Sequence, residues 1–560
     1  HPEDAYERGI LDQDPVEIRN SRGAVRVNAR VTDRIKRGVV FLPMHWGKLL
    51  GKDHGRANNV THEAIDPQSK QPGFKYAAVT VERYQKDKQK IVIVGAGAAA
   101  FRFINTYRSL NQDDELHVFS REEWPFYDRV LLPDYAIAHK TWEDLLKFKK
   151  GEFERLNTQL YVSNEVTAID RDNKQVTDSK GVQHDYDLLV MATGSRAFVP
   201  PGVPLYLPGV FTMRDRRNAD DLKDHLLKDH HPGDPDKHLI IVGGGLLGLE
   251  LAAAMSEVAV KVSIVQLGSR LMERQLDPIA SSLLREYIEN DLDIRVITND
   301  EVRQIDLLVN KNGLQASLKS GLHLHCDALV YAIGTRPNTE LGKDCGLEAA
   351  RGIKVNDHLQ TSDPEIFALG EIAEHQQKLN GITAAAEQQA DVCARFIAGD
   401  VTGRYNGSTP MNILKFPNLD LCSIGMTEIP VDGKGYDEIL FLDRSELYYK
   451  KCIIHHDRLV GAILLGDKAE FAEFKELIDH QTELSEKRVQ LLRSGKVSEP
   501  VIGELVCSCN NQGVGNIEKA IAEGCSSLNE ICSRTGAGLG CGSCKPEVHR
   551  ILESVKEKIN

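Results

Sequence analysis

The stretch that decides the fold is KIVIVGAGAAAF, Lys90 to Phe101. An apolar, β-branched run leads into the pattern Gly95-x-Gly97-x-x-Ala100, and a helical pattern follows it. Gly95 permits a tight turn, Gly97 lets the backbone approach a pyrophosphate, and the small Ala100 lets the helix pack closely on the strand. The N-terminus of that helix then faces the phosphate charge. The stretch therefore predicts a strand, turn and helix that bind a dinucleotide.

A second copy of this pattern occurs later in the chain. The stretch HLIIVGGGLLGLE, His238 to Glu250, has Gly243, Gly245 and Gly248 after another apolar run. One Gly-rich strand exit can be a plain turn, but two copies in the same strand-to-helix context indicate two dinucleotide sites. We therefore predict an α/β protein with two Rossmann-like domains.

Composition places the chain among ordinary globular proteins. It has 560 residues, of which 41% are hydrophobic and 27% charged, and this length predicts several domains. No run of about 18 apolar residues occurs, so we expect no membrane partner. The net charge of −13 argues against a nucleic-acid partner. The chain starts at His1 inside ordinary domain sequence, so we expect it to be a piece of a longer polypeptide.

An acidic pair follows the second strand expected in the first unit. That strand, LHVFS, covers 116–120, and Glu122 and Glu123 come soon after it. A carboxylate at this place usually binds the ribose hydroxyls of an adenine dinucleotide. We assign Glu122 to that role, and a solvated surface carboxylate is the alternative for either residue.

The second unit lacks such an acid. Its next strand, VKVSIVQ (260–266), ends at Gln266, and Arg270 follows. Gln266 cannot repel a 2′-phosphate as a carboxylate would, and Arg270 could accept one, so these residues leave NADH and NADPH open. We place Glu250, on the helix of this unit, near the nicotinamide end. Its alternative role is a charge on the helix surface.

Two cysteine pairs lie near the C-terminus. They are Cys507-x-Cys509 and Cys541-x-x-Cys544, with 31 residues between the pairs. Thiolates at such short spacing converge on a metal or a cluster, and four of them suit a [2Fe-2S] cluster. Zinc and a structural disulfide are the alternatives. The odd total of 11 cysteines, mostly scattered, favours a reducing, cytoplasmic setting.

Several stretches resemble flavin-dependent pyridine nucleotide reductases, in the branch of nitrite and nitrate reductase electron-transfer proteins. They are PFYDRVLLP (125–133), ATGS (192–195), ALVYAIGTRPNT (328–339) and TSDPEIFALGEIAEH (361–375). The resemblance implies an FAD domain with an inserted NAD(P)H domain, and it favours NADH. It also implies FAD contacts from Arg129, Thr193, Gly194, Gly370 and Glu371, with weaker assignments for Glu387 and Gln388 at the start of a helix.

The C-terminal part resembles the bacterioferritin-associated-ferredoxin-like module. VCSCNNQGVGNIEKAIAEG and TGAGLGCGSCKPEVHRIL are the stretches that carry this resemblance. It implies a [2Fe-2S] cluster on Cys507, Cys509, Cys541 and Cys544. Residues 408–500 alternate polar and apolar side chains like an antiparallel sheet. By the reductase resemblance, this segment is an interface domain that covers the flavin and often forms a homodimer.

The N-terminal part resembles the end of the molybdopterin-dinucleotide-binding domain of molybdenum oxidoreductases, the nitrate reductases in particular. HPEDAYERGI, SRGAVRVNARVTDRIKRGVVFLPMHWG and ANNVTHEAIDPQSKQPGFK carry the resemblance. It implies contacts from Asn58 and Lys75 to molybdopterin guanine dinucleotide in the full-length protein. We expect the molybdenum catalytic portion upstream of His1 or in a separate chain. A fragment that binds nothing by itself is the alternative.

Together these parts predict an FAD-dependent NAD(P)H oxidoreductase with no catalytic side chain, because the flavin supplies the hydride chemistry. No Cys-x-x-Cys or Cys-x-x-x-x-Cys pair occurs within 88–405, so we expect electrons to leave through the cluster. The molybdopterin resemblance implies an assimilatory nitrate reductase, which reduces nitrate to nitrite. One alternative is an NAD(P)H nitrite reductase large-subunit type without its sirohaem domain. Another class of alternative is a non-catalytic iron–sulfur redox sensor or ferredoxin-like partner.

The expected domains follow from these segments. They are residues 1–85 for the molybdopterin-domain end, 88–204 and 341–405 for FAD binding, 205–340 for NAD(P)H binding, 408–500 for the interface domain, and 501–560 for the small helical [2Fe-2S] domain.

Overall fold

The computed structural model describes residues 1–43, 56–61, 68, 76–84, 88–148, 151, 155–228, 237–258, 260–308, 313–416, 418–485, 488, 491, 500–540 and 542–559. They form two compact units, His1–Lys88 and Gln89–Asn560. Two of the predicted site residues, Lys75 and Cys541, lie outside the described residues.

The first unit is a small domain with a three-stranded antiparallel sheet. Val16 and Ile18 alternate on the central strand β1 and are buried, as the period of two in a strand requires. Its elements are α1 (Pro2–Glu7), β1 (Pro15–Asn20), β2 (Gly23–Asn28), the 3-10 helix η2 (Ala57–Val60) and β3 (Thr80–Arg83).

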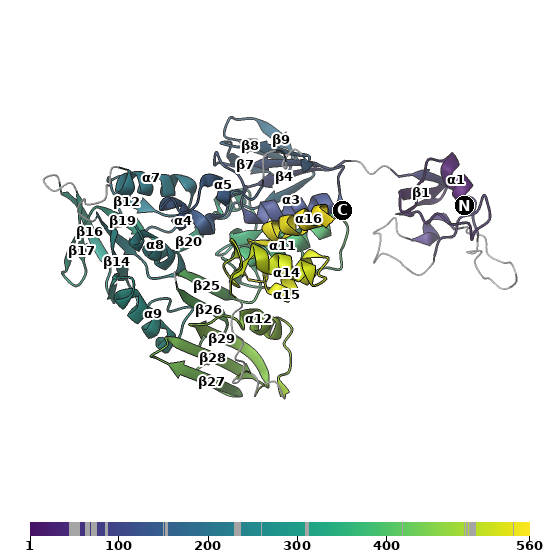
Figure 1. Cartoon of the computed structure of the whole chain (residues 1–560). Helices are drawn as coiled ribbons and strands as arrows, with labels where there is room; N and C mark the ends of the chain where they lie inside the picture. The colour runs from purple at the N-terminus through teal and green to yellow at the C-terminus, as the bar shows by residue number, and fades with distance from the viewer. Residues whose placement is uncertain are drawn as a thin grey trace. The chain divides into compact units, whose positions relative to one another are not determined.

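The second unit contains two parallel sheets with the same strand plan (Figure 1). Their orders are β22-β10-β4-β5-β6 and β12-β19-β13-β14-β15. The central strands β4 (Lys90–Val94) and β13 (Lys237–Val242) precede the two Gly-rich turns, and they are almost wholly buried because both faces are covered. The helices α3 (Ala98–Leu110) and α8 (Leu246–Ser256) follow. The predicted α/β class with two Rossmann-like sheets is confirmed.

The second sheet is an insertion into the first, because β22 pairs with β10 after the second sheet is complete. The other strands of the two sheets are β5 (Glu115–Phe119), β6 (Thr158–Tyr161), β10 (Leu188–Met191), β22 (Ile366–Ala368), β12 (Val210–Thr212), β14 (Val260–Gln266), β15 (Arg295–Thr298) and β19 (Ala328–Tyr331). An antiparallel sheet accompanies each: β7 (Val166–Asp170), β8 (Gln175–Asp178) and β9 (Gln183–Asp185); β16 (Val302–Leu308), β17 (Gly313–Leu318) and β18 (His323–Cys326).

Helices and short strands complete this body. The helices are η3 (Arg129–Leu131), α4 (Leu132–Ala136), α5 (Trp142–Leu145), α7 (Arg216–Leu227), α9 (Pro278–Asn290), α10 (Glu340–Asp344), η4 (Gly370–Ile372) and α11 (Thr383–Ile397). The short strands are β11 (Ser195–Ala197), β20 (Thr335–Pro337), β21 (Ile353–Val355), β23 (Ala373–His375) and β24 (Lys378–Leu379).

Two glycines determine how each sheet meets its turn. Gly95 and Gly243 have φ angles of 111° and 118°, which side chains of L-residues rarely adopt. A Cβ atom at Gly95 would lie 2.2 Å from the carbonyl oxygen of Ala192, and one at Gly243 would lie 2.5 Å from that of Ala332. Ala192 and Ala332 directly follow β10 and β19. Each strand exit therefore packs on the neighbouring Gly-rich turn, and only glycine permits this contact.

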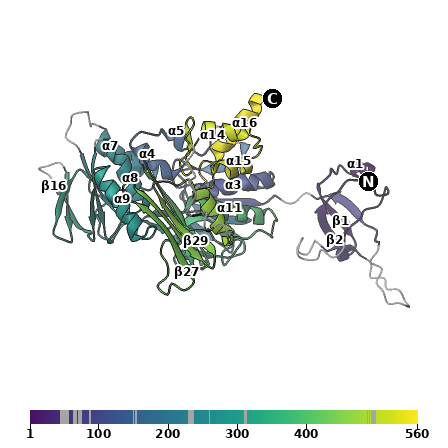
Figure 2. The same ribbon diagram turned by 60° about the horizontal axis from the view of Figure 1, so that its bottom comes forward.

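An antiparallel sheet and a helical module follow the parallel sheets. The sheet has the order β25-β26-β29-β28-β27 and packs against α12. Figures 1 and 2 show the helices of the C-terminal module beside α3 and α11. The elements are β25 (Met411–Phe416), β26 (Leu419–Gly425), β27 (Tyr436–Asp443), β28 (Tyr448–His455), β29 (Arg458–Leu465), α12 (Phe471–Asp479), β30 (Leu505–Cys507), β31 (Gln512–Gly513), α14 (Val514–Ala522), α15 (Leu528–Thr535) and α16 (Lys545–Ile559).

We expect Gly95→Ala to lower the free energy of unfolding by about 3 kcal/mol, because the new methyl group adds a backbone clash to the strain of a positive φ. Gly181→Ala is the matched control, since Gly181 also has a positive φ, of 78°, but no heavy atom lies within 4 Å of its Cβ position. Its loss should be about 1 kcal/mol. Urea unfolding of both variants measures the difference, and equal losses would contradict the packing described for Ala192.

Candidate functional site

A cavity of about 1610 Å³ is lined by both Gly-rich turns. This volume exceeds that of a usual small-ligand pocket, roughly 300–1,000 Å³, and has room for two dinucleotides. The structure brings most of the predicted site residues to its walls. These lining residues are Gly95, Gly97, Glu122, Arg129, Thr193, Gly194, Gly370, Glu371, Gly243, Gly245, Glu250, Gln266 and Cys509.

The helices α3 and α8 begin at this cavity without a side-chain cap. Their N-cap residues are Gly97 and Gly245, and no side chain accepts a hydrogen bond from the first turn at either position. A Cβ atom at either glycine would meet no heavy atom within 4 Å, so open space adjoins both. The first N–H groups of each helix and the positive end of its dipole therefore face that space. This arrangement fits the pyrophosphate groups of FAD and NAD(P)H.

The third small residue of each pattern packs away from the cavity. Ala100 is fully buried in the core of the first sheet. A Cβ atom at Gly248 would lie 2.1 Å from the carbonyl oxygen of Gly243. Both residues therefore let a helix lie close to its strand, which is the role that the pattern predicts for them.

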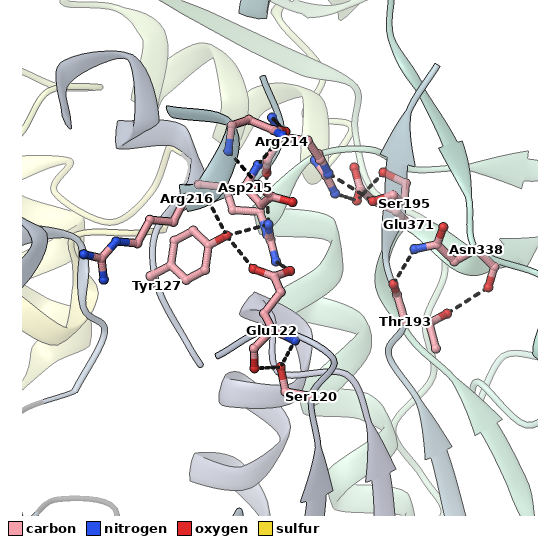
Figure 3. Close-up of polar contacts among 12 residues, drawn as sticks. Ser120, Glu122, Tyr127, Thr193, Ser195, Arg214, Asp215, Arg216, Asn338 and Glu371 are labelled. Atoms are coloured by element: carbon pink, nitrogen blue, oxygen red, sulfur yellow. Dashed lines mark hydrogen bonds and ion pairs between the residues drawn. The ribbon is translucent and has the colours of Figure 1, made fainter. Parts of the chain in front are cut away.

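Glu122 and Arg129 form an ion pair at the cavity wall, with 2.6 Å between Nη2 and Oε1. Tyr127 donates its hydroxyl to Glu122 Oε2 at 2.7 Å and accepts from Arg129 Nη1 at 2.7 Å (Figure 3). Burial acts to lower the pKa of the Arg129 guanidinium, but Tyr127 and Glu122 outweigh it and raise that pKa. Burial also raises the pKa of the Tyr127 hydroxyl. A carboxylate–guanidinium ion pair therefore lies where the sequence predicts the adenine end of FAD.

Glu371 has a cationic partner that the sequence did not suggest. Arg214 Nη2 pairs with Glu371 Oε2, and the Ser195 hydroxyl donates to the same oxygen at 2.8 Å (Figure 3). Arg214 Nε also donates to the Ser195 carbonyl at 3.1 Å. Arg214 follows β12 in the inserted segment, so it connects the inserted sheet to η4, which carries Glu371. Its place directly after a short strand was the signal available in the sequence.

Thr193 holds together the two passages of the chain between the sheets. Its hydroxyl donates to the Asn338 carbonyl at 2.9 Å, and the Asn338 side-chain amide donates to the Thr193 carbonyl at 2.8 Å. Next to this pair, β11 and β20 run antiparallel. Gly194, with a φ of 63°, makes the turn between Thr193 and β11. Thr193 and Gly194 therefore mainly stabilise the two passages of the chain between the parallel sheets.

The two residues predicted to bear on nucleotide choice, Gln266 and Arg270, both have partners within the protein. Gln266 uses its side-chain oxygen to accept the Gly244 N–H at 2.8 Å, so it supports the Gly-rich turn. Arg270 does not line the cavity, and it is ion-paired with Glu428 at 2.6 Å.

Glu273 is an acid near the end of β14 that the sequence reasoning missed. Its carboxylate lines the cavity, and a Cβ atom at Gly268 would lie 2.0 Å from Glu273 Oε2 and 3.1 Å from Gln266 Nε2. A carboxylate thus stands beside the Gln266 amide, although it lies later in the sequence than the pattern predicts. Arg274 and Arg303 also line this region, and Arg303 is ion-paired with Glu301 at 2.5 Å.

Glu250 and the start of α11 lie where the cavity meets the five-stranded antiparallel sheet β25-β26-β29-β28-β27, called the interface sheet below. Glu250 Oε1 accepts the backbone N–H of Lys415 in β25 at 3.3 Å. Ile382 and Thr383, at the N-terminus of α11, line the cavity. Gln388 is exposed and accepts the Ser408 hydroxyl at 2.6 Å, so it does not face the cavity.

Three of the four predicted cluster ligands converge. The thiol of Cys507 forms hydrogen bonds with those of Cys509 and Cys544, and the backbone N–H groups of Asn510 and Gly538 also point at its sulfur. These contacts lower the pKa of Cys507 far below the ordinary thiol range, against the effect of burial. Sulfur donors that converge with backbone N–H groups fit a [2Fe-2S] cluster. Cys541 lies outside the described residues.

Residues 89–405 contain three cysteines, Cys326, Cys345 and Cys393, and burial disfavours the thiolate form of each. Burial raises the pKa of Cys326 to about 12, and it also raises the pKa values of Cys345 and Cys393. Among the described cysteines, Cys509 is the one that lines the cavity. The described chemistry therefore matches electron transfer through a cluster better than dithiol exchange.

The molybdopterin residues are described only in part. Asn58 lies in η2 with an exposed side chain, and its carbonyl accepts the Thr61 hydroxyl at 3.1 Å. Lys75 is outside the described residues. An exposed amide suits a pterin or purine edge, but one residue does not define a site, so both assignments stay predictions.

Residues 89–390 match the pyridine nucleotide-disulphide oxidoreductase family, and the chain belongs to this family. It is accordingly an FAD-dependent oxidoreductase that uses NAD(P)H. Three further matches cover the molybdopterin dinucleotide binding domain at 1–78, the rubredoxin NAD+ reductase C-terminal domain at 410–482, and the BFD-like [2Fe-2S] binding domain at 505–554.

Two curated relatives come from Bacillus subtilis. Nitrite reductase [NAD(P)H] is 34% identical over 83% of this chain, and the assimilatory nitrate reductase electron transfer subunit is 30% identical over 83%. The chain spans 58% and 59% of the lengths of these relatives. The crystal structure of NADH:rubredoxin oxidoreductase from Clostridium acetobutylicum is 26% identical, with a TM-score of 0.57 over 71% of this chain and 97% of that one.

No helix in the described part of the chain combines the length and the apolar character that crossing a membrane requires.

We expect Gly97→Glu to abolish FAD content, because its carboxylate would occupy the open space at the N-terminus of α3 and repel a pyrophosphate. Gly403→Glu is the control, since a Cβ atom at Gly403 also meets no heavy atom within 4 Å but Gly403 does not line the cavity, and this variant should keep its flavin. Visible absorption of the purified proteins measures the flavin. A normally yellow Gly97→Glu protein would contradict the assignment of this turn to FAD.

We expect Glu273→Gln to lower the preference for NADH over NADPH, measured as the ratio of kcat/KM values, by roughly tenfold. A carboxylate beside Gln266 should repel a 2′-phosphate, and tenfold corresponds to about 1.4 kcal/mol. Glu348→Gln, at an exposed carboxylate outside the cavity, is the control. An unchanged ratio in the Glu273 variant would assign nucleotide choice to other residues.

Proposed function

We propose that this chain is the electron-transfer part of an NAD(P)H-dependent assimilatory nitrate reductase. Electrons pass from NAD(P)H by way of FAD and a [2Fe-2S] cluster to a molybdenum site, where nitrate becomes nitrite. The sum is NADH, one proton and nitrate giving NAD⁺, nitrite and water. The observation that carries the proposal is the molybdopterin dinucleotide binding match at 1–78, directly before the reductase match at 89–390.

The order of the parts supports this route. When bound, FAD supplies hydride acceptance, and a [2Fe-2S] cluster supplies one-electron transfer. The chain's own residues hold the two dinucleotides on the N-termini of α3 and α8 and bring Cys509 to the same cavity. A covalent connection between electron donor and acceptor raises their effective concentration. The similarity to the assimilatory nitrate reductase electron transfer subunit agrees with this proposal.

A second candidate is the electron-transfer part of an NAD(P)H nitrite reductase. The higher identity to nitrite reductase [NAD(P)H], 34% against 30%, favours it. The two candidates share the path from NAD(P)H to the cluster and differ in what accepts the electrons. The molybdopterin dinucleotide binding match at 1–78 favours nitrate as the acceptor. The molybdenum oxidoreductases that residues 1–85 resemble most are the nitrate reductases.

The discriminating experiment uses the natural polypeptide, purified with its molybdenum portion, in an anaerobic assay with NADH. Nitrate reductase activity predicts nitrite formation from nitrate, with one NADH consumed for each nitrite. NADH consumption with nitrite, and none with nitrate, would assign the chain to the second candidate. No turnover with NADH and ferricyanide would instead indicate a non-catalytic binding protein.

We expect Cys509→Ser to keep NADH-dependent ferricyanide reduction within about twofold and to lower nitrate reduction by at least about a hundredfold, because only the second reaction needs the cluster. Cys525→Ser, a cysteine of the same module outside the two pairs, is the control and should change neither rate. Equal losses of both activities in Cys509→Ser, with iron content lowered, would show that the cluster serves the fold instead.

A further inference from the structure

One buried cation beside the interface sheet, Lys468, contacts the C-terminal module. Lys468 lies between β29 and α12, and its side chain is 8% exposed. Its Nζ is 2.8 Å from Asp420 Oδ1 of β26 and donates to the Ser508 carbonyl at 2.9 Å. Ser508 stands between Cys507 and Cys509, so this ammonium group reaches into the loop that carries the first cysteine pair.

The carboxylate of Asp420 makes a second contact with the same loop. Its other oxygen accepts the side-chain amide of Asn511 at 3.4 Å. The segment from Cys507 to Asn511, called the cysteine loop below, is thus bound at Ser508 and at Asn511. Both contacts originate from one ion pair on the interface sheet.

Apolar contacts seat the rest of the module beside this ion pair. Ile413 of β25 packs against the module's core, and a Cβ atom at Gly540 would lie 3.2 Å from Ile413 Cδ1. Glu387 of α11 also lies close to the module, because a Cβ atom at Gly542 would lie 2.6 Å from Glu387 Oε2. Ile413 and Cys509 line the same cavity as the Gly-rich turns. The cysteine loop therefore lies at the wall of the cavity that would hold the flavin.

A buried ammonium group is costly unless charge and hydrogen bonds compensate it. The Lys468 ammonium adds directional contacts to the apolar packing of the module on the sheet. It fixes where the cysteine loop lies, because the Ser508 carbonyl and the Asn511 amide must meet partners of defined geometry. Small displacements of a group that takes part in a reaction change the rate of that reaction strongly.

We propose that the Lys468–Asp420 pair positions the cysteine loop for electron passage from the flavin side of the cavity to the cluster. Lys468 and Asp420 are positioning residues, since neither contacts a reacting atom. The inference rests on the proposed function only for the electron path as far as the cluster. With FAD and the cluster bound, one hydride from NADH would bring two electrons and one proton; the electrons would cross this contact singly, and the proton would go to solvent.

The test uses the double variant Lys468→Met/Asp420→Asn. Removing both charges avoids an uncompensated buried ion, and methionine keeps the length of the lysine stem. The control is Lys475→Met/Asp479→Asn, which removes an ion pair within α12. Iron content and flavin content are measured first, so that all variants are compared as loaded protein.

Two readouts decide the outcome. In stopped-flow absorbance with NADH, the double variant should bleach its flavin at the wild-type rate but reduce its cluster at least about tenfold more slowly. In hydrogen exchange, amides of residues 505–513 should exchange faster in the double variant and not in the control. If the double variant loses iron, Lys468→Met alone replaces it, because Asp420, whose side chain is 21% exposed, then keeps the Asn511 amide as a hydrogen-bond donor while the Ser508 contact is lost.

Wild-type rates of cluster reduction in the double variant would overturn the proposal, whether or not hydrogen exchange changes. Slower flavin bleaching with a matching delay of the cluster would also overturn it, because the effect would then lie in hydride transfer. A wild-type protein whose cluster NADH never reduces would count against the proposed function itself. Failure to reduce nitrate would leave the positioning role intact.

Discussion

The structure depends on two uncapped helix N-termini that face one cavity. The helices α3 and α8 start at glycines, Gly97 and Gly245, with open space in front of them. Their exposed N–H groups need an anionic partner, and a dinucleotide pyrophosphate supplies one. The turns that aim these helices require Gly95 and Gly243, because the exits of the neighbouring strands pack on them. The two binding units therefore share the same structural feature, a Gly-rich turn that leads into an uncapped helix N-terminus.

Charge pairing then shapes the space between the two units. Glu122 with Arg129, and Glu371 with Arg214, stand on the cavity wall as ion pairs joined to Tyr127 and Ser195. The Arg214 pair connects the inserted sheet to η4, so the cavity wall and the domain arrangement share the same contacts. The described part of the flavoprotein body has buried, weakly acidic thiols in place of a reactive pair. Electron exit through the cysteine loop, which adjoins this wall, is the route that we propose.

Local patterns were enough to predict the two Gly-rich units, the α/β class and the cysteine pairs, because each depends on residues within one turn or one strand exit. The partners of the predicted residues could not be read in the same way. Arg214 meets Glu371 across 157 positions, and Lys468 meets Ser508 across 40. Gln266 lines the cavity and also accepts the Gly244 N–H, and Glu273, an acid beside it, was not predicted from the sequence. Such contacts follow from tertiary packing, which periodicity does not encode.

The most direct test of the electron path is anaerobic addition of NADH to the purified, iron-loaded protein, followed by visible absorption and low-temperature EPR. Bleaching of the flavin together with a [2Fe-2S]⁺ signal is the predicted result, and it would establish passage from nucleotide to cluster within this chain. Bleaching without that signal, in protein whose iron content matches a full cluster, would contradict the path. The cysteine module would then be a structural element rather than the exit for electrons.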